Sequence, residues 1–385
     1  MILIQQYIKS YKEYFKKIIF FAGKYWIIKP DVFKNKYDII FLFQKHDISG
    51  ATRVHLDIVS LLTECSKLVV FIEHSKQDGL LGKYKLQSEV FPIKNRLLRR
   101  FYLGMLSTLI NKSDPDFFFG MGSPSFYIVT GAIKNPKVKI IDINHAVSGL
   151  HFAPEDLIPR LHKRIVIDPF TKEELIKYYK KNGFSTSHIK LINNKTYLPE
   201  SVKKPHAVST SILYVGRSSV EKRVYLVAEI AKKLSTKIDF ELTMIGDFRD
   251  DFIHRNAHYI RFIPEIVDEH MLSKYYVTSD ILLLVSSREG FPMVIMEAMA
   301  HGVVPVCTPA GGIPYYIESG NNGFIIEGNN ENEIIENAVQ TIVSLNDNKV
   351  LLNGVSRNAY EYASANFSEE KFDTEYRELF CTLSK

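Results

Sequence analysis

The chain has 385 residues, 46% of them hydrophobic and 24% charged, which is the mixture expected of a globular protein with two domains. Three scattered cysteines favour a reducing compartment without structural disulfides, and no apolar run reaches the roughly 18 to 20 residues of a membrane span. Lysines interrupt the apolar stretch near the N-terminus, so we expect no signal peptide, and the formal net charge of +6 is unevenly distributed along the chain.

Short apolar runs alternate with helix-length amphipathic segments in the first half of the chain. The runs predict strands at 38–43, 68–73, 116–119, 138–143 and 164–167. The amphipathic segments predict helices at 51–62, 97–111 and 171–181. Such alternation indicates a parallel sheet covered by helices.

The alternation pauses at 195–209, where prolines and lysines break any regular period, and we place a domain boundary there. It resumes with strands at 211–215, 240–245, 259–262, 280–285 and 303–307, and with helices at 220–234, 291–300, 331–345 and 349–366. We therefore predict an α/β protein with two Rossmann-like, doubly wound domains, at 1–200 and 205–366. A cleft between them is expected to face the carboxyl ends of the strands. A C-terminal helix at about 367–385 is expected to pack back on the first domain.

The segment 286–302 contains the most informative motif. It follows a buried strand, and Pro292 suits the first turn of a helix, where a missing N–H costs nothing. Gly290 lets a ligand approach the backbone, and the helix start offers N–H groups and a positive dipole end to a diphosphate. Glu289 and Glu297 suit such a site only if the ligand also presents hydroxyl groups, as a nucleotide sugar does. The alternative is a helix-start acid at Glu289 and a solvated Glu297.

Two further segments favour the nucleotide sugar. Gly216-Arg217 ends a strand and Lys222 follows five residues later, so two cations meet the place where a leaving diphosphate gains charge. A glycine turn at 308–314 follows another strand and is expected to shape the same edge.

These residues resemble the family 4 retaining glycosyltransferases of GT-B fold. The matching elements span about 110 residues in one order, and they are Gly216-Arg217…Lys222, Glu289-Gly290-Phe291-Pro292…Glu297-Ala298, Gly302, Pro305, Gly311-Gly312-Ile313-Pro314 and Gly320…Asn322-Gly323. The resemblance implies that Arg217 and Lys222 hold the diphosphate, that Glu289 lies at the transferred sugar and that Glu297 binds the ribose. It implies a donor site formed by Gly50, Gly216, Arg217, Lys222, Gly290, Phe291, Pro292, Met293, Val294 and Glu297. One departure concerns Tyr315, which stands where the family often has an acid, and this puts contacts at that corner in doubt.

The N-terminal half carries fewer matches. Gly50, after the first strand, resembles the family's glycine loop, although an ordinary strand–helix turn explains it equally well. His145 ends a strand and resembles the family's histidine near the sugar; the alternative is a structural histidine. Asn194 resembles the family's asparagine before the interdomain linker. The resemblance thus implies Glu289, His145, Arg217 and Lys222 as the catalytic set.

Two other motifs are set aside. Asp114-Pro115-Asp116 imitates a metal signature, but it precedes a strand and reads as a proline turn. Gly120-Met121-Gly122, with Asp142 about twenty residues on, imitates a dinucleotide fingerprint that lacks its third glycine. No His/Cys cluster has metal-ligand spacing, so we expect no metal and no cofactor.

Residues 1–200 hold 31 Lys/Arg against 18 Asp/Glu, whereas residues 201–385 hold 18 against 25. The basic half is expected to attract phosphate-rich partners. Because basic and apolar residues alternate at helical spacing in 92–103, we predict membrane contact through Lys94, Arg96, Arg99 and Arg100. An evenly solvated basic surface is the alternative, and nucleic acid is not expected as a partner.

The sequence therefore predicts a glycosyltransferase that moves a hexose, with retention, from a nucleoside-diphosphate sugar to an acceptor hydroxyl. By resemblance, the acceptor is a glycan or lipid-linked glycan of lipopolysaccharide, capsule or another surface polysaccharide. The expected location is the cytoplasm, with peripheral contact at the cytoplasmic face of the inner membrane. A phosphorylase or epimerase of the same fold, and a scaffold without catalysis, are the alternatives.

Overall fold

The computed structural model describes residues 2–47, 49–73, 75, 79–145, 153–199, 209–248, 258–266 and 268–384. The chain forms two compact units. Unit 1 contains the residues up to Ile167, Thr171–Ile192 and the residues from Glu375 on, and unit 2 contains Asp168–Phe170 and Asn193–Thr374. Most of the linker segment at 195–209 that the sequence singled out, namely 200–208, lies outside the described residues.

Unit 1 contains a seven-stranded parallel sheet in the order β3-β2-β1-β4-β5-β6-β7. Its strands are β1 (Ile39–Phe43), β2 (Lys67–Phe71), β3 (Glu89–Pro92), β4 (Phe117–Met121), β5 (Lys139–Asn144), β6 (Lys163–Val166) and β7 (Ile189–Leu191). The chain order reverses between β1 and β4, and such a switch point is where ligands bind in open α/β sheets.

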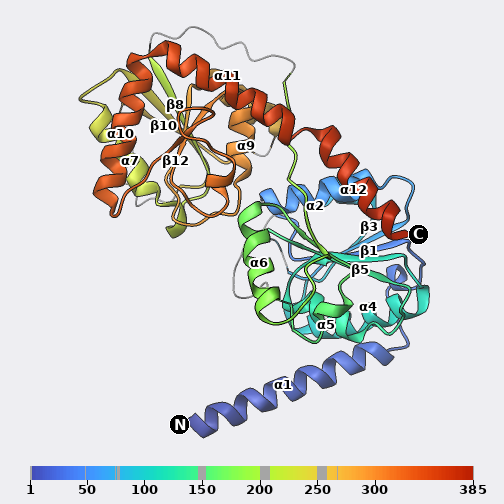
Figure 1. Ribbon diagram of the computed structural model, residues 1–385. Helices are drawn as coiled ribbons and strands as arrows, with labels where there is room; N and C mark the ends of the chain where they lie inside the picture. Colours follow the sequence, from blue (N-terminus) through green and yellow to red (C-terminus); the bar gives the residue numbers. More distant parts are fainter. Residues whose placement is uncertain are drawn as a thin grey trace. The chain divides into compact units, whose positions relative to one another are not determined.

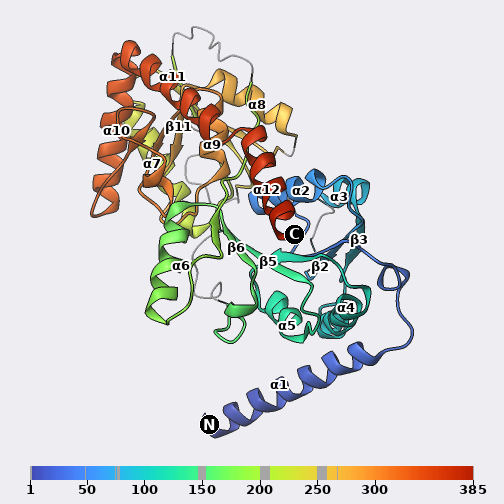
Figure 2. The same ribbon diagram turned by 45° about the vertical axis from the view of Figure 1, so that its right-hand side comes forward.

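Helices lie on both faces of this sheet, and Figures 1 and 2 show α4 and α5 together on one of them. The helices of unit 1 are α1 (Ile2–Tyr25), α2 (Gly50–Leu61), α3 (Leu81–Gln87), α4 (Arg99–Ser113), α5 (Pro124–Ala132) and α6 (Pro169–Lys181). Alternate strand residues point to opposite faces. Ile40 and Leu42 therefore share a core with α4 and α5, while the ring of Phe43 stacks on His55 of α2.

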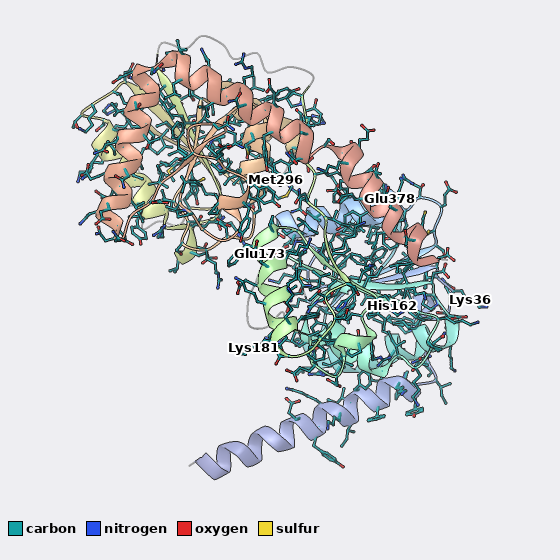
Figure 3. The ribbon with its side chains drawn as sticks, in the orientation of Figure 1. Lys36, His162, Glu173, Lys181, Met296 and Glu378 are labelled. Atoms are coloured by element: carbon teal, nitrogen blue, oxygen red, sulfur yellow. The ribbon has the colours of Figure 1, made fainter. Side chains whose placement is uncertain are left out.

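Unit 2 contains a six-stranded parallel sheet in the order β10-β9-β8-β11-β12-β13. Its strands are β8 (Thr210–Val215), β9 (Phe240–Ile245), β10 (Ile260–Ile263), β11 (Ile281–Leu284), β12 (Val304–Cys307) and β13 (Phe324–Ile325). Its helices are α7 (Val224–Leu234), α8 (Glu269–Thr278), α9 (Met293–Ala300), α10 (Glu331–Asp347) and α11 (Lys349–Asn366). Met296 of α9 is part of the buried core (Figure 3). The switch point of this sheet lies between β8 and β11.

The last helix, α12 (Glu369–Ser384), occupies the segment predicted at about 367–385. Its residues from Glu375 on belong to unit 1, where the ring of Phe380 lies 5.0 Å from that of Phe117 on β4.

The prediction of an α/β fold with two Rossmann-like, doubly wound domains is confirmed, but three local predictions are wrong. The helix predicted at 220–234 is interrupted at Arg223, which is left-handed (φ 46°) between a short 3-10 turn and α7. Residues 124–132, for which no helix was predicted, form helix α5, because Ser123 Oγ accepts a hydrogen bond from the Phe126 N–H and Pro124 occupies the first turn. Helix α9 begins at Met293, so Pro292 caps it from outside.

Among the described residues no helix has the length and apolar character needed to cross a bilayer.

A buried ion pair joins β5 and β6 of unit 1. Arg164 and Asp142 are both fully buried, with Nη2 and Oδ2 2.9 Å apart, and the hydroxyl of Tyr127 donates to the same Oδ2. Arg164 Nη1 also donates to the Tyr179 hydroxyl. The Asp142 carboxylate is thus bound to buried side chains of the core. It is not exposed to a ligand, as the dinucleotide fingerprint would require.

We predict that Arg164→Met lowers the free energy of unfolding by about 3–5 kcal/mol, because it leaves the Asp142 carboxylate buried without its cation. The double variant Asp142→Leu/Arg164→Met is expected to lose less, since no charge then remains buried. Urea unfolding followed by circular dichroism measures both. Equal losses in the single and double variants would contradict this explanation.

Candidate functional site

The loops after β8 and β11 meet at the switch point of unit 2. Lys222, after β8, and Glu289, after β11, form an ion pair with Nζ and Oε1 2.5 Å apart. Their side chains are only 20% and 10% exposed. Two residues that lie 67 positions apart, and that the sequence placed in one site, are therefore in direct contact.

Backbone contacts hold the same two loops together. The Ser287 N–H donates to the carbonyl of Glu221 at 2.7 Å, beside Lys222. The guanidinium of Arg223 donates to the carbonyls of Val285 (2.7 Å) and Ser286 (3.1 Å). These bonds explain the left-handed break at Arg223, because it turns the side chain toward the end of β11.

The glycine turn after β12 supports Glu289 from the other side. Gly311 has φ +58°, and a Cβ there would lie 1.8 Å from the Glu289 carbonyl oxygen. The Gly312 N–H donates to the Gly290 carbonyl at 2.8 Å. The turn therefore requires glycine at Gly311, both for its φ angle and for the close approach of the two backbones.

The negative charge of Glu289 acts on two buried neighbours. Burial and the nearby carboxylate raise the pKa of the Tyr214 phenol well above its ordinary value, and they raise the pKa of the Cys307 thiol in the same way. Both groups therefore stay neutral, and neither adds charge beside the ion pair of Lys222 and Glu289.

Gly216 and Arg217 lie at the end of β8. The Gly216 N–H donates to the Ile245 carbonyl at 3.0 Å, and a Cβ on Gly246 would lie 2.0 Å from the Gly216 carbonyl oxygen. Arg217 is exposed, and within the described part of the chain no carboxylate lies at ion-pair distance from it. Its guanidinium is accessible to an anionic ligand.

Phe291 and Met293 begin the segment that leads into α9. Phe291 is buried, and its ring stacks on that of Tyr316 at 4.1 Å, so its side chain belongs to the core. The Met293 sulfur accepts a hydrogen bond from Asn194 Nδ2 at 3.5 Å, which joins two residues that the family resemblance singled out. Val294 lies in the first turn of the helix, after Pro292.

Glu297 is the fifth residue of α9 and is partly buried. The hydroxyl of Tyr276, on α8, donates to its Oε2 at 2.7 Å. His301 lies one turn further on; its ring stacks on Tyr276, and its Nε2 is 2.7 Å from the Ser273 hydroxyl. Sequence reasoning missed Tyr276, because α8 itself was not predicted.

Gly50 and His145 lie at the carboxyl edge of the unit 1 sheet. Gly50 begins α2, where Ser49 caps the helix, and the neighbouring Ile48 lies outside the described residues. His145 follows β5, and its Nε2 is 2.8 Å from Nε2 of His55 on α2. His55 is buried and stacks on Phe43 with ring centroids 4.1 Å apart. His55 was not predicted, although its position on the helix that Gly50 opens could have suggested it.

The residues predicted to contact a membrane lie before and within the first turn of α4. Lys94 and Arg96 are exposed, whereas Arg99 and Arg100 are partly buried. Arg99 Nη1 lies 3.7 Å from a carboxylate oxygen of Glu73. Burial lowers the pKa of Arg100 from its ordinary value. Their role at a membrane stays a prediction.

A separate pocket of about 430 Å³ opens on unit 2 next to the loop after β12. Arg223, Ser286 and Thr308 contribute to its lining, but none of the predicted donor residues does. We therefore do not assign the donor to it. In the described ranges no three His, Cys, Asp or Glu side chains are arranged to hold a metal ion.

Two parallel, doubly wound sheets in one chain are the architecture of the GT-B class of glycosyltransferases. One of the solved structures that this chain resembles is HepE of Anabaena, crystallised with UDP-glucose, at a TM-score of 0.71 and 17% identity over 90% of this chain and 100% of that chain. This similarity shows the fold.

Residues 209–344, which lie in unit 2, match the family model described as "Glycosyl transferases group 1". The N-acetyl-alpha-D-glucosaminyl L-malate synthase of Bacillus anthracis is 27% identical over 186 residues, which cover 46% of this chain and 48% of that protein. The lipopolysaccharide 1,2-N-acetylglucosaminetransferase of Salmonella typhimurium is 26% identical over 130 residues, which cover 30% and 34%. The chain thus matches about half, or less, of the length of these relatives. The resemblance to glycosyltransferases of GT-B fold is confirmed.

The contact between His55 and His145 predicts a pH dependence of stability. Burial, and to a lesser degree the neighbouring His145, lowers the pKa of His55 well below 6.5 in the folded protein. As the pH falls below about 6.5, the unfolded chain binds a proton that folded His55 does not bind, so the free energy of unfolding decreases.

We expect His55→Gln to reduce this loss. Urea unfolding at a series of pH values from about 7 down to about 5 measures it, with His162 and His188 contributing equally to both proteins. An identical slope in the wild type and the variant would show that His55 is not the group responsible.

Proposed function

We propose that the protein transfers a hexose from a nucleoside-diphosphate sugar to an acceptor hydroxyl and retains the anomeric configuration. The observation that supports this most is the ion pair of Lys222 and Glu289 at the switch point of unit 2, within the residues that match the group 1 family model. A cation and a carboxylate at 2.5 Å suit a ligand whose diphosphate needs the one and whose sugar hydroxyls need the other.

In this proposal the two cations bind the diphosphate. Arg217, which is exposed, and Lys222, which is partly buried, come from the same loop after β8, so both can reach one pyrophosphate group. Negative charge grows on the leaving phosphate as the sugar–oxygen bond breaks, and fixed cations stabilise that charge. The backbone N–H groups of Gly290 and Phe291, ahead of α9, add donors for the same charge.

The carboxylates of the site are proposed to bind hydroxyl groups. Glu289 is held by Lys222 and by the Gly311 turn, and it would accept hydrogen bonds from the transferred sugar. Glu297 is oriented by Tyr276 and would accept from the ribose. We propose that His145 lies near the transferred sugar and that Gly50 belongs to the donor site, as the family resemblance implies.

Retention is proposed to follow from a front-face route. The incoming hydroxyl attacks the anomeric carbon on the face that the leaving phosphate departs from, and a phosphate oxygen takes its proton. We propose no metal or other cofactor, because the two cations supply the positive charge that the leaving group needs.

The biological setting is also proposed. HepE was crystallised with UDP-glucose, and the Salmonella relative is named as a lipopolysaccharide sugar transferase. These likenesses support a nucleotide sugar as donor and a lipopolysaccharide, capsule or other surface glycan as acceptor. We propose a cytoplasmic reaction with peripheral contact at an anionic membrane.

Nucleotide binding tests the roles of Glu297 and Tyr276. We expect Glu297→Ala to weaken UDP binding by about tenfold or more, since a hydrogen bond to a charged group is lost. Tyr276→Phe is expected to weaken it less, because the carboxylate remains but loses its orientation. Isothermal titration calorimetry measures both.

The matched control is Tyr225→Phe, which removes a second Tyr–Glu hydrogen bond in unit 2, to Glu331; neither residue is among the predicted donor residues. Its affinity for UDP is expected to equal that of the wild type. If Glu297→Ala bound UDP with unchanged affinity, the proposal that Glu297 binds the ribose would be wrong.

The reaction itself is tested with a panel of nucleotide sugars, with and without acceptor glycan. We expect donor consumption that requires acceptor, continues in EDTA, and yields a product whose anomeric configuration by NMR equals that of the donor. An inverted linkage would reject the front-face route. Conversion of the donor without acceptor would indicate another nucleotide-sugar enzyme.

A further inference from the structure

Helix α1 precedes the first strand of unit 1 and packs on α4 through a close backbone crossing. A Cβ on Gly23 would lie 1.9 Å from the Phe101 carbonyl oxygen, and a Cβ on Gly104 would lie 2.1 Å from the Phe20 carbonyl oxygen. The Thr108 hydroxyl donates to the Lys24 carbonyl at 2.7 Å. The C-terminal part of α1 is therefore fixed in orientation on α4, and Figures 1 and 2 show α1 along the outside of the unit.

The opposite face of α1 exposes an apolar row, which we call the stripe. It consists of Tyr14, Ile18, Phe21 and Tyr25, spaced by four, three and four residues, all of them exposed. Gly23 stands two residues from Phe21 and from Tyr25, about 200° around the helix, so the stripe faces away from α4. Tyr25 is 73% exposed, and the Lys24 ammonium lies 6.0 Å from the ring centroid of Phe21 and 5.9 Å from that of Tyr25.

The chain after α1 continues this apolar surface. Ile27 is 92% exposed and Ile28 79%, and Trp26 is half exposed with its ring 5.4 Å from that of Phe101. Contiguous exposed apolar side chains of this kind mark an interaction surface. Tyrosine and tryptophan beside isoleucine are the composition of the water–lipid boundary.

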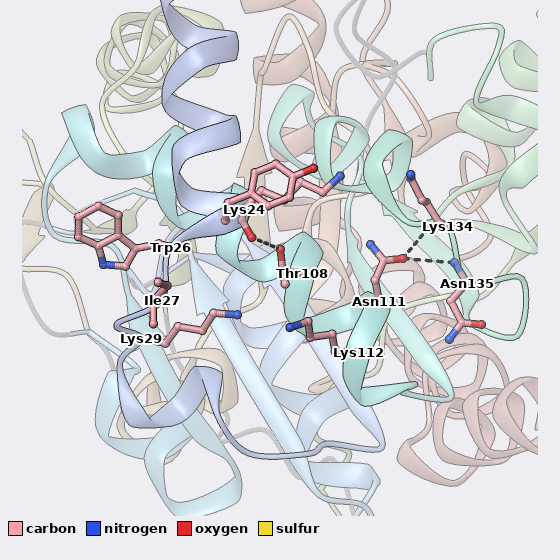
Figure 4. A pocket seen from close by; sticks show the side chains of 10 residues that line it. Lys24, Trp26, Ile27, Lys29, Thr108, Asn111, Lys112, Lys134 and Asn135 are labelled. Atoms are coloured by element: carbon pink, nitrogen blue, oxygen red, sulfur yellow. Dashed lines mark hydrogen bonds between the residues drawn. The ribbon is translucent and has the colours of Figure 1, made fainter.

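A pocket with several lysines lies next to the end of the stripe, and we call it the lysine pocket (Figure 4). It measures about 880 Å³ and is lined by Lys24, Tyr25, Trp26, Ile27, Lys29, Thr108, Asn111, Lys112, Lys134 and Asn135. No carboxylate is among these residues. The ammonium groups of Lys29 and Lys112 point toward one another (Figure 4), and burial together with the charge of Lys112 lowers the pKa of Lys29.

An anion relieves this repulsion between lysines, because it places negative charge among cations that have no carboxylate partner in the described chain. The side-chain oxygen of Asn111 is already hydrogen-bonded. It accepts from the backbone N–H groups of Lys134 and Asn135 at 2.6 and 3.3 Å. The amide nitrogen of Asn111 donates to the carbonyls of Ser107 and Ala132. The pocket therefore offers the ammonium groups of Lys24, Lys29, Lys112 and Lys134 beside an asparagine whose polar atoms are already hydrogen-bonded.

We propose that this surface binds an anionic phospholipid bilayer, with the stripe inserted at the water–lipid boundary and lipid phosphates bound by the lysine pocket. A helix with an apolar face and lysines beside it binds membranes in this way. A second copy of the chain fits less well, because it would bring lysines against lysines. None of Lys94, Arg96, Arg99 and Arg100 is part of the stripe or of the lysine pocket, and binding to this surface requires no sugar transfer.

Vesicle co-sedimentation of the full chain tests the proposal. The wild type is expected to sediment with vesicles of phosphatidylcholine mixed with phosphatidylglycerol, and much less with phosphatidylcholine alone. The stripe variant Ile18→Ser/Phe21→Ser/Tyr25→Ser and the pocket variant Lys29→Glu/Lys112→Glu/Lys134→Glu are each expected to bind anionic vesicles about tenfold or more weakly.

Two control variants make changes of the same kind elsewhere on unit 1, one apolar substitution and three lysine substitutions. Leu86→Ser removes an apolar side chain that is 82% exposed on α3, and Lys85→Glu/Lys180→Glu/Lys181→Glu makes the same change of charge on exposed lysines. Both are expected to bind like the wild type. Circular dichroism and UDP binding of every variant verify folding, and they separate loss of lipid binding from failure of the proposed transferase function.

Three results would overturn the proposal. One is equal sedimentation of the wild type with neutral and anionic vesicles. Another is a folded stripe or pocket variant that binds anionic vesicles as the wild type does. The third is a lipid-free dimer, seen by analytical ultracentrifugation, that the stripe variant abolishes, because the stripe would then belong to an interface between copies.

Discussion

The ion pair between Lys222 and Glu289 is the contact on which the arrangement of unit 2 depends most. It joins the loops after β8 and β11, the two strands between which the sheet order reverses. A parallel sheet leaves its loops at this edge without strand partners, so something else must hold them. Here the ion pair, the Arg223 guanidinium on two carbonyls and the tight approach of Gly311 to Glu289 do so together. The two loops are thus held in position without a ligand. Binding of a charged group requires such preorganisation.

In unit 1 a different contact lies at the carboxyl edge of the sheet. Its carboxyl edge holds two imidazoles in contact, one of them buried and kept neutral, rather than an ion pair. Its ion pair lies inside the sheet, between Asp142 and Arg164, where tyrosine hydroxyls satisfy the remaining polar atoms. In unit 1 the buried charged pair therefore stabilises the core, whereas lysines carry charge on the surface. In unit 2 the charged pair lies at the edge where chemistry is proposed.

The sequence predicted the fold class and most central strands, because buried parallel strands are continuous apolar runs with clear breaks. It missed the short edge strands β3, β7 and β13, whose few residues carry little pattern. It also missed the break at Arg223, since an arginine with a left-handed backbone has no local signal and depends on carbonyls more than sixty positions away. Lys222 and Glu289 could be placed together from motif spacing. Tyr276 could not, because α8 was not predicted and Tyr276 acts through a tertiary contact with Glu297, whereas His55 lies on the predicted helix after Gly50.

The topology of unit 1 keeps the lysine pocket apart from the residues proposed to serve the sugar. Lys112 ends α4 and Lys134 follows α5, so both stand in connections that lead into the amino ends of β4 and β5. Gly50 and His145 stand after the carboxyl ends of β1 and β5. In a parallel sheet these are opposite edges, separated by the length of a strand, or roughly 16 Å for five residues. A bilayer bound at the lysine pocket therefore leaves the carboxyl edge of the unit open to water. Because the lipid binding and the donor chemistry that we propose use opposite edges, substitutions that abolish one are expected to leave the other intact.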